Sequence, residues 1–313
     1  MEATEYPLVS VVMATYNGEA FLEKQLESVF QQTYSNIEII VVDDSSTDNT
    51  ISILLSHAKQ HAGMKVFRNE TNLGFVKNFE KGCALTSGAF IALCDQDDYW
   101  HPDKIKHMVQ AIGEYPMIYC NSLLCDQDLK STGVYISDRA VLKPITNCLQ
   151  QAVFCRIYGH ASLFTKELYQ KAAPFLEVIP HDWWLCYIAS LNGGIQYLEE
   201  PLVHYRQHAS NLYGAVGGKR RKKSKEEELK KKRQEITNIR IRINAFADAC
   251  PVGFVKEKKV LEALGKSYSS FSLANNVMRV YLFFRYYKLL LAVKKRSLLR
   301  KYLFCLKMFV MIK

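Results

Sequence analysis

The sequence predicts an α/β fold with a mostly parallel sheet, on the strength of three observations. Short apolar runs rich in β-branched residues alternate with segments whose apolar residues recur at helical spacing. Consecutive runs leave room for a helix of about 10 to 15 residues, as in crossovers between parallel strands. Polar side chains directly follow the runs, and in such a sheet these strand ends lie together at the edge where ligands bind. We therefore expect a Rossmann-like sheet flanked by helices.

The first two strands are expected at residues 9–13 and 37–42. Both runs are apolar and largely β-branched, as is typical of strands buried on both faces of a parallel sheet. Loop residues 14–18 follow the first strand, and apolar side chains then recur at helical spacing up to Phe30. Residues 43–48 follow the second strand, and their acidic and hydroxyl side chains favour turns and helix caps.

The next elements lead to a cluster of acids. We expect a helix, a strand, a loop and a helix, in that order, at residues 51–61, 65–68, 72–74 and 76–85. The apolar strand at residues 91–94 is followed by the acids Asp95, Asp97 and Asp98, and Pro102 then opens a helical pattern. Hard carboxylate oxygens at the end of a strand suit a divalent cation such as Mg²⁺ or Mn²⁺. An acidic loop that caps the following helix is the alternative.

No glycine-rich phosphate loop accompanies these acids. Neither GxGxxG nor GxxxxGK[ST] follows any of the expected strands. A bound diphosphate would therefore have to be neutralised by a metal that the carboxylates hold.

The sequence up to residue 215 contains further elements of the same kind. Residues 126–146 are polar and turn-rich, which suits a loop over the site. A turn is expected at Pro201, before the motif HYRQH at residues 204–208. The remaining strands are expected at residues 117–120, 160–164 and 195–198, and the remaining helices near residue 166 and at 180–191.

Composition and charge restrict the classes of function. The chain has 313 residues, of which 49% are hydrophobic, so it can bury a sizeable core. The formal net charge is +10, and the basic excess lies beyond Lys219, which indicates an anionic partner for that part. The nine cysteines lack paired CxxC spacing, so we expect reduced thiols in the cytosol and no structural zinc. Residues 1–10 have neither the basic nor the apolar region of a secretion signal.

The chain after residue 215 is expected to form a basic helical extension. The glycine-rich residues 214–218 indicate a boundary between one domain at 1–215 and the extension at 216–313. Residues 219–235 are expected to form a charged, solvated helix. Their basic residues are interleaved with glutamates and lack an aromatic surface for bases, so we expect no nucleic-acid partner.

Residues 277–313 combine aromatic, aliphatic and basic residues and contain no acid. Their uncharged stretches are too short to span a bilayer. We expect an amphipathic helix or helix pair that lies on an anionic membrane surface, with a helix packed on the preceding domain as the alternative. The cations expected among the lipid head groups are Arg285, Lys288, Lys294, Lys295 and Arg296.

Four ordered motifs carry a resemblance to a known family. They are VSVVMATYN from residue 9, VVDDSSTDNT from residue 41, NLGF from residue 72 and GAFIALCDQDDYWHPDKI from residue 88. Over residues 7–215 the sequence resembles the inverting glycosyltransferases of family 2, which have the GT-A fold. The resemblance implies a nucleotide-binding half at 1–120 and an acceptor half at 121–215. Tyr99 and Trp100 after DQDD, and the later YRQHASN, most resemble bacterial rhamnosyltransferases of polysaccharide assembly.

The resemblance implies a nucleotide site on the first half. Tyr16 and the backbone around Ala14 would line the base and the ribose. Asp44 would accept a hydrogen bond from N3–H of uracil or thymine, and the acid before it would order the loop. Asn72 and Gly74 would close the pocket, although Gly74 could equally serve only a turn.

A metal site is implied as well. Asp95 and Asp97 correspond to the DxD pair of the family. Asp97 would bind the metal directly, and Asp95 would reach the ribose, or the metal through water. His208 would complete the metal shell, and Arg206 would reach the diphosphate. The implied cofactor is Mn²⁺ or Mg²⁺.

The resemblance places the acceptor at the helix expected at 180–191. Asp182 takes the position of the general base, next to His181, where many relatives carry Glu. An N-cap role is compatible with this, because capping would lower the pKa of Asp182 and fix its aim. Trp183 and Trp184 could stack on a sugar ring. Since adjacent helix residues point in different directions, we expect one of the two in the core.

These roles together imply a metal-dependent inverting transferase. A single base on the face of the anomeric carbon opposite the leaving diphosphate gives inversion in one displacement. The expected donor is a UDP- or dTDP-linked sugar, and the expected acceptor is a hydroxyl of a growing surface polysaccharide on a polyprenyl diphosphate lipid. That acceptor implies a cytoplasmic protein, peripheral on the inner face of the cell membrane. The alternative is a non-catalytic nucleotide-sugar-binding or scaffold protein of a glycan assembly complex.

Overall fold

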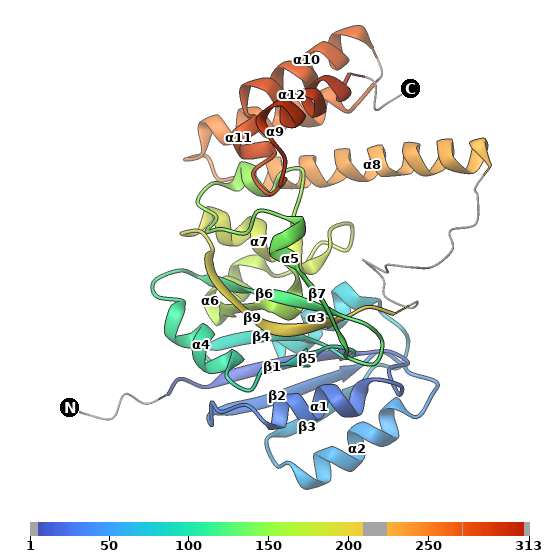
Figure 1. Cartoon of the computed structure of the whole chain (residues 1–313), viewed down its shortest axis with the longest axis vertical. Coiled ribbons are helices and arrows are strands. Elements are labelled where there is room, and N and C mark those ends of the chain that lie inside the picture. The colour runs from blue at the N-terminus through green and yellow to red at the C-terminus, as the bar shows by residue number, and fades with distance from the viewer. Residues whose placement is uncertain (1–5, 209–223, 271, 310–313) are drawn as a thin grey trace. The chain divides into compact units, whose positions relative to one another are not determined.

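The computed structural model describes residues 6–208, 224–270 and 272–309, which form two compact units (Figure 1). The sheet unit comprises the described parts of Met1–Asp138, Leu142–Pro144 and Ile157–Val216. The helical unit comprises the described parts of Arg139–Val141, Ile145–Arg156 and Gly217–Lys313. The boundary expected at residues 214–218 lies outside the described residues.

The sheet unit is built on a nine-stranded mixed sheet in the order β3-β2-β1-β4-β8-β6-β9-β5, with β7 paired to β6. Four strands run parallel, as predicted: β1 (Val9–Thr15), β2 (Ile37–Asp43), β3 (Met64–Arg68) and β4 (Phe90–Asp95). Nearly every residue of β1, β2 and β4 is buried, because helices cover this part of the sheet on both faces. The predicted Rossmann-like α/β fold is confirmed.

The remaining strands extend the sheet beyond β4. β8 (Ser162–Thr165) runs antiparallel between β4 and β6 (Met117–Cys125), and β9 (Gln196–Arg206) runs parallel to β6. The short strands β5 (Tyr99–Trp100) and β7 (Ser131–Tyr135) pair with β9 and β6. Since β9 pairs with β5, the chain near residue 204 returns to the segment that directly follows the DQDD acids.

Helices pack on this sheet and close its core. α2 lies against β3, and α3 lies against β1 and β2. The main core joins apolar side chains of the parallel strands with those of α1 and α4. The helices of the sheet unit are α1 (Leu22–Phe30), α2 (Thr50–Gln60), α3 (Phe75–Ala84), α4 (Lys104–Ala111), α6 (Lys166–Ala172) and α7 (His181–Leu191). The short helical turns are α5 (Ile136–Arg139), η1 (Cys148–Gln151) and η2 (Gly159–Ala161).

Several boundaries differ from the predictions for local reasons. β9 continues through Pro201, where a turn was expected. Pro201 lies opposite Asn121 at a shift of register, and such irregularities accommodate a residue without an N–H. The helix expected from Pro102 begins at Lys104 of α4, and the short strand β5 precedes it. The strand expected at 160–164 is preceded by η2, and β7 and α5 occupy part of the loop expected at 126–146.

The helical unit contains the longest helix of the described chain. α8 (Lys225–Ala249) begins with a capping box in which Ser224 and Glu227 each accept a backbone hydrogen bond from the other. The other helices are α9 (Val255–Ser267), α10 (Leu273–Arg285), α11 (Tyr287–Leu290) and α12 (Leu298–Lys307). No helix in the described ranges combines the length and apolar character that crossing a bilayer requires.

Arg279 of α10 is fully buried in the helical unit. Its Nε donates a hydrogen bond to the Met308 carbonyl at 2.9 Å, and its other guanidinium nitrogens donate to the Ser267 carbonyl and to Oδ1 of Asn276. The guanidinium carbon also lies 4.8 Å from the centre of the Tyr268 ring. One side chain thus satisfies polar groups from the ends of α9 and α12, which holds these helices to α10.

Candidate active site

The ends of three parallel strands carry the polar side chains predicted to gather at one edge. Thr15 lies opposite Asp43 in the pairing of β1 with β2, and Ala14 lies opposite Asp95 in the pairing of β1 with β4. The loops that follow these strands therefore lie side by side and can contribute to one site.

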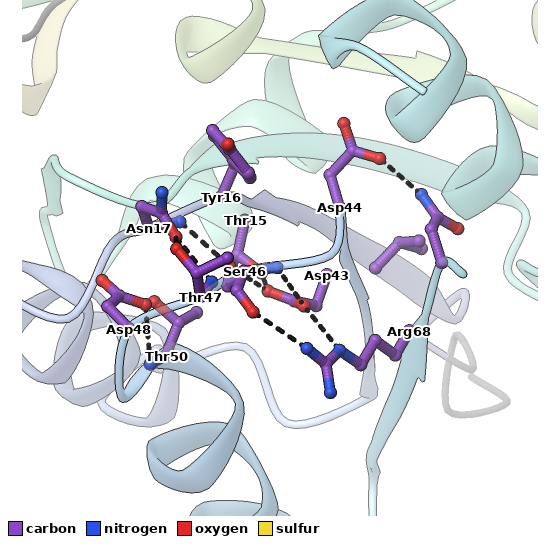
Figure 2. Close-up of polar contacts among 12 residues, drawn as sticks. Thr15, Tyr16, Asn17, Asp43, Asp44, Ser46, Thr47, Asp48, Thr50 and Arg68 are labelled. Carbon is purple, nitrogen blue, oxygen red and sulfur yellow. Dashed lines mark hydrogen bonds and ion pairs between the residues drawn. The ribbon is translucent and has the colours of Figure 1, made fainter. Parts of the chain in front are cut away.

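Asp43 ties the end of β1 to the loop after β2, as Figure 2 shows. Its side chain is fully buried and accepts hydrogen bonds from the Thr15 hydroxyl at 3.1 Å and from the Ser46 backbone N–H at 3.0 Å. Nε of Arg68 lies 3.6 Å from the carboxylate and compensates its charge. Ser45 has a φ of +65°, which is uncommon for a residue other than glycine. This burial fits the loop-ordering role that was predicted for Asp43.

Asp44 joins the same loop to the segment before α3. Its Oδ1 accepts hydrogen bonds from the Leu73 N–H at 2.8 Å and from Nδ2 of Asn69 at 2.7 Å, and its Oδ2 accepts one from the Gly74 N–H at 2.9 Å. Oδ1 of Asn72 lies 3.1 Å from the same Gly74 nitrogen. Gly74 has a φ of +80°, so the backbone there requires glycine. Asp44, Asn72 and Gly74 thus lie in one hydrogen-bonded cluster.

The Tyr16 ring is 47% exposed at the end of β1. Its backbone N–H donates to Oε1 of Gln96 at 2.9 Å, and its carbonyl accepts from Nε2 of Gln96 at 3.0 Å. Gln96 is the second residue of DQDD and was not predicted as a site residue. It fixes the loop after β1 to the acidic segment and leaves the Tyr16 ring accessible to a ligand.

Asp97 and His208 lie in direct contact. Nε2 of His208 is 2.8 Å from Oδ2 of Asp97, and the two side chains are 8% and 17% exposed. The His208 ring also packs on Phe21, with ring centres 4.4 Å apart. An imidazole nitrogen and a carboxylate oxygen at this separation, with an opening to solvent, can bind one metal ion together.

A second group of acids and imidazole lies beside the first. Nδ1 of His160 is 3.1 Å from Oδ2 of Asp98 and 3.5 Å from Oδ2 of Asp95. Ligand atoms of these three residues all lie within 4.8 Å of one another, so this group could also hold a metal ion. Asp98 and His160 are fully buried, whereas the Asp95 side chain is 41% exposed. His160 was not among the predicted metal ligands, and Asp98 was predicted only as one of three acids that together suit a divalent cation.

Burial and neighbouring charges shift the pKa values of Asp98 and Asp95 in opposite directions. Burial, and then the charges of Asp97 and Asp95, raise the pKa of Asp98 well above its ordinary value. Burial also opposes ionisation of Asp95, but the hydrogen bond and charge of His160 hold the pKa of Asp95 below its ordinary value. Asp95 is therefore the ionised acid of the pair and the one that a ligand can reach.

The buried side chain of Lys104 binds the backbone of His160. The ammonium group is fully buried, lies 3.1 Å from the centre of the Trp100 ring and donates to the His160 carbonyl at 2.8 Å. Burial lowers the pKa of Lys104 to about 8. A lysine at the start of α4 thus fixes the turn that carries His160.

Arg206 is buried and supports the acidic loop. Its Nε donates to the Asp97 carbonyl at 2.6 Å, its Nη1 donates to the Gln127 carbonyl at 2.6 Å, and its backbone N–H donates to Oδ1 of Asp98 at 3.0 Å. The guanidinium also lies 4.7 Å from the centre of the Phe21 ring. The contact with a diphosphate stays a prediction for Arg206, and it would have to coexist with these bonds.

Asp182 lies in the first turn of α7 and is partly buried. Its Oδ1 accepts a hydrogen bond from the Trp183 N–H at 2.7 Å, and Pro180 occupies the N-cap position. Burial raises the pKa of Asp182 to about 7, and the charge of Asp95 adds to this effect. The expectation that capping lowers this pKa is therefore wrong, because burial outweighs the backbone hydrogen bonds.

His181 and Gly159 fix the start of α7. The His181 ring is buried against Phe79, with ring centres 4.2 Å apart, and burial lowers its pKa to about 4, so the ring is neutral. A Cβ on Gly159 would lie 3.1 Å from Nε2 of His181 and 3.8 Å from Cβ of Asp182. An added side chain at this position would therefore require the His181 ring to shift by a few tenths of an ångström.

The two tryptophans of α7 have different environments. Trp184 is buried, and its indole N–H donates to the Ala172 carbonyl at 2.7 Å. Trp183 is partly exposed. As expected, one of the two tryptophans, Trp184, belongs to the core. Trp183 remains the candidate for stacking on a sugar.

Fold and site together define a glycosyltransferase of the GT-A fold. Residues 10–173, just over half of the chain, match the family model described as glycosyl transferase family 2, and the chain belongs to this family.

Two curated relatives illustrate the similarity. The chain is 31% identical over 219 residues to the putative glycosyltransferase EpsH of Bacillus subtilis, a match that covers 66% of this chain and 63% of EpsH. It is 40% identical over 103 residues to an uncharacterized glycosyltransferase of Haemophilus influenzae, which covers 33% of this chain and 32% of that protein. The chain thus matches less than two-thirds of the length of either relative.

Solved structures share the fold at low sequence identity. TarS 1–349 of S. aureus in complex with UDP-GlcNAc has a TM-score of 0.57 and 15% identity, with coverage of 97% of this chain and 90% of that one. The mannosyltransferase PcManGT from Pyrobaculum calidifontis, in complex with GDP-Man and Mn²⁺, has a TM-score of 0.56 and 17% identity, with coverage of 99% and 86%.

Proposed function

We propose that this glycosyltransferase is metal-dependent and inverting, and that it uses a UDP- or dTDP-linked sugar. The observation that carries the proposal is Asp182. A carboxyl group whose pKa is about 7 stands at the start of α7, close enough to the DxD segment for the charge of Asp95 to act on it. A group with such a pKa can accept a proton near neutral pH, which is what a general base requires.

Each part of the site has a role in the proposed displacement. Asp182 would take the proton of the acceptor hydroxyl as its oxygen bonds to the anomeric carbon. The bond from that carbon to the nucleoside diphosphate breaks on the opposite face, which inverts the configuration. Asp97 and His208 would bind Mn²⁺ or Mg²⁺, and Asp95 would reach the ribose, or the ion through water. A bound ion would neutralise the charge of the leaving diphosphate.

The proposed preference for a pyrimidine rests on the capacity of Asp44. Its Oδ1 already accepts two hydrogen bonds, whereas its Oδ2 accepts one within the described residues. Asp44 is 2% exposed, so a base would reach it through a movement of the loop at 72–74. One remaining acceptor position there would match the single N3–H of uracil or thymine better than the two adjacent donors of guanine. The exposed ring of Tyr16 would line the base and the ribose, together with the backbone of Ala14.

We further propose that the acceptor is a surface polysaccharide that grows on a polyprenyl diphosphate lipid. Trp183, on the same helix as the base, would contact a sugar of the acceptor or donor. The transferred sugar would be a hexose or a deoxyhexose such as rhamnose. An enzyme with this acceptor works on the cytoplasmic face of the cell membrane.

Calorimetric titration with UDP, dTDP and GDP, with and without Mn²⁺, tests the donor class. We expect Mn²⁺-dependent binding of a pyrimidine diphosphate that is lost in Asp97→Ala. Asp182→Asn should abolish transfer and leave this binding nearly unchanged. An Asp182→Asn variant that still turns over at a near-normal rate would refute the base assignment. Binding without any turnover in the unaltered protein would favour a nucleotide-sugar-binding scaffold instead.

A further inference from the structure

Three cations gather on the helical unit without an acidic partner. They are Arg156, contributed by the segment after η1, and Lys294 and Arg296, which lie between α11 and α12. Both arginines act electrostatically on Lys294, and no carboxylate does. Among the residues that the structure describes, no ion pair involves any of the three. Like charges that are held together in this way favour an anionic ligand.

Aromatic rings and backbone bonds hold the cations in place. Nζ of Lys294 lies 3.8 Å from the centre of the Phe154 ring, and the Arg296 guanidinium lies 5.2 Å from the centre of the Phe304 ring. The two rings pack edge to face, with centres 5.9 Å apart. The backbone of residue 294 forms a bridge with that of residue 140. Burial, and then the two arginines, lower the pKa of Lys294 to about 8. The ammonium is therefore poorly compensated by its surroundings.

The start of α12 adds further donors at the same place. Ser297, its N-cap residue, directly follows Arg296 and makes no side-chain capping bond. The first N–H groups of a helix have no partner within the helix and attract anions, phosphate groups in particular. The cation cluster and this helix terminus therefore favour the same kind of ligand.

An exposed apolar face begins where the cluster ends. Leu299, Leu303 and Leu306 of α12 are 69%, 49% and 53% exposed. Their spacing of four and three residues places them on one face of the helix. Exposed basic residues, Arg300 and Lys307, lie on the same helix. Large apolar side chains that are exposed together on one helix face indicate a surface that contacts a membrane or another molecule.

The charge of the chain around α12 distinguishes between the possible partners of the exposed leucine face. Every charged side chain after Glu262 is basic. A symmetric contact between two copies through α12 would bring like charges together, which is unfavourable. A nucleic acid is also an unsuitable partner, because its phosphate backbone offers no apolar surface to the exposed leucines. A surface of phosphates over an apolar layer satisfies both the cations and the leucines.

We propose that Arg156, Lys294, Arg296 and the start of α12 bind the phosphates of anionic phospholipids, with Leu299, Leu303 and Leu306 inserted among the acyl chains. This extends the lipid-linked acceptor of the proposed function to a specific docking face, and it does not depend on transfer chemistry. The structure also changes the sequence-based picture of residues 277–313. Several of their apolar side chains, such as Leu282, Phe283 and Leu290, form the core of the helical unit instead of facing lipid.

Flotation of the full-length protein with vesicles tests the proposal. Vesicles of phosphatidylcholine with phosphatidylglycerol in equal parts should bind the protein, and phosphatidylcholine alone should bind it far more weakly. Replacement of Arg156, Lys294 and Arg296 by Gln should weaken binding to the anionic vesicles about a hundredfold, since each cation near such a surface contributes about a fivefold factor. Leu299→Ser, Leu303→Ser and Leu306→Ser combined should abolish binding, because these side chains supply the apolar contact.

Matched controls separate the site from general charge and surface effects. Arg233, Lys256 and Lys259 are exposed on α8 and α9. Their replacement by Gln removes the same charge and should change binding less than about twofold, because exposed charges at a distance are screened by salt. Val252 and Val255, which are 85% and 54% exposed, provide the control for the leucines when changed to Ser. Nucleotide binding should be unchanged in all variants, so a failure of docking is distinguishable from a failure of the transferase assignment.

Three results would overturn the proposal. Equal losses in the site triple and the control triple would show that only net charge matters. Release of the protein from vesicles by excess inorganic phosphate at constant ionic strength would assign the cluster to a soluble anion. Self-association without vesicles that is lost in the leucine variant would make the α12 face a contact between copies.

Discussion

Nε2 of His208 lies 2.8 Å from Oδ2 of Asp97, although the two residues are separated by 111 positions in the sequence. The contact is possible because β9 returns to pair with β5, which directly follows the acidic segment. The last described residue of the sheet unit thus completes a site that begins in its first half. A change at either residue should therefore affect the same function.

The metal ligands can be tested by spectroscopy on Mn²⁺-loaded protein. Pulsed electron paramagnetic resonance detects coupling between Mn²⁺ and a bound imidazole nitrogen. We expect this coupling to be lost in His208→Gln and retained in His160→Gln, because His160 is fully buried behind Asp95. Mn²⁺ affinity should fall at least tenfold in Asp97→Asn and in His208→Gln. Loss of the coupling in His160→Gln instead would place the ion at Asp95, Asp98 and His160.

The pH dependence of transfer should report the Asp182 carboxyl. Burial raises its pKa to about 7, and the base must be ionised to act. Activity should therefore rise with pH through about 7, with a roughly tenfold increase in the ionised fraction between pH 6 and pH 8. Measurement of kcat/KM over this pH range checks the direction of the change in activity and the pH at its midpoint. Any trace of activity that remains in Asp182→Asn should be independent of pH, and a matching pH dependence in that variant would assign the titration to another group.

Asp44→Asn should open the loop at 72–74. The amide can no longer accept hydrogen bonds at both side-chain positions, so the Leu73 or Gly74 N–H loses its partner, at a local cost of about 1–3 kcal/mol. Hydrogen exchange of these two amides should accelerate, and nucleotide affinity should fall about tenfold or more. Asp48→Asn is the control, because Asp48 caps a different loop and should leave the exchange at 72–74 unchanged.

Gly159→Ala should lower the rate of transfer with little effect on nucleotide affinity. The added Cβ would meet Nε2 of His181 at 3.1 Å, so we expect the His181 ring, and with it the adjacent base Asp182, to shift by a few tenths of an ångström. Small displacements of a catalytic group can cost up to about a hundredfold in rate, so we expect a loss of tenfold or more in kcat. Gly253→Ala, where a Cβ meets nothing within 4 Å, should have no effect. Equal activity in both variants would contradict the required close approach.

Arg279→Met should destabilise the helical unit by at least about 2 kcal/mol, because it leaves the Ser267 and Met308 carbonyls without their donors. In scanning calorimetry, the midpoint temperature of one unfolding transition should fall, while the midpoint of the transition of the sheet unit should be unchanged. Arg285→Met on the same helix removes an exposed charge and should alter stability by less than about 0.5 kcal/mol. A shift of similar size in both variants would argue against the buried role.

The sequence was sufficient to predict the parallel part of the fold. Strands buried on both faces have continuous apolar runs, so β1, β2 and β4 are recognisable locally, and the acids at their ends follow from the same pattern. Pro201 was misassigned because a proline predicts a turn unless the partner strand is known. Its place opposite Asn121 in a register shift is decided by tertiary pairing alone.

The supporting residues of the site could not be predicted for a different reason. Gln96, Lys104 and His160 act through contacts with segments far away in the sequence, as when Gln96 bonds to Tyr16. Nothing in their local pattern distinguishes them from surface residues. Asp98 was visible as part of DQDD, but its complete burial and its raised pKa depend on neighbours that only the fold supplies.

The segment at Ile145–Arg156 has a consequence for any attempt to divide the chain. It lies within the first 215 residues but packs with the helical unit, where Nδ2 of Asn147 donates to Oε1 of Glu257 at 3.0 Å and Cys148 and Leu149 are buried. A gene cut near residue 216 would strip this segment of the helices that cover it and expose its apolar side chains to water. The two units are therefore interwoven along the polypeptide, and a shortened gene for the helical unit must keep residues 145–156 together with its helices.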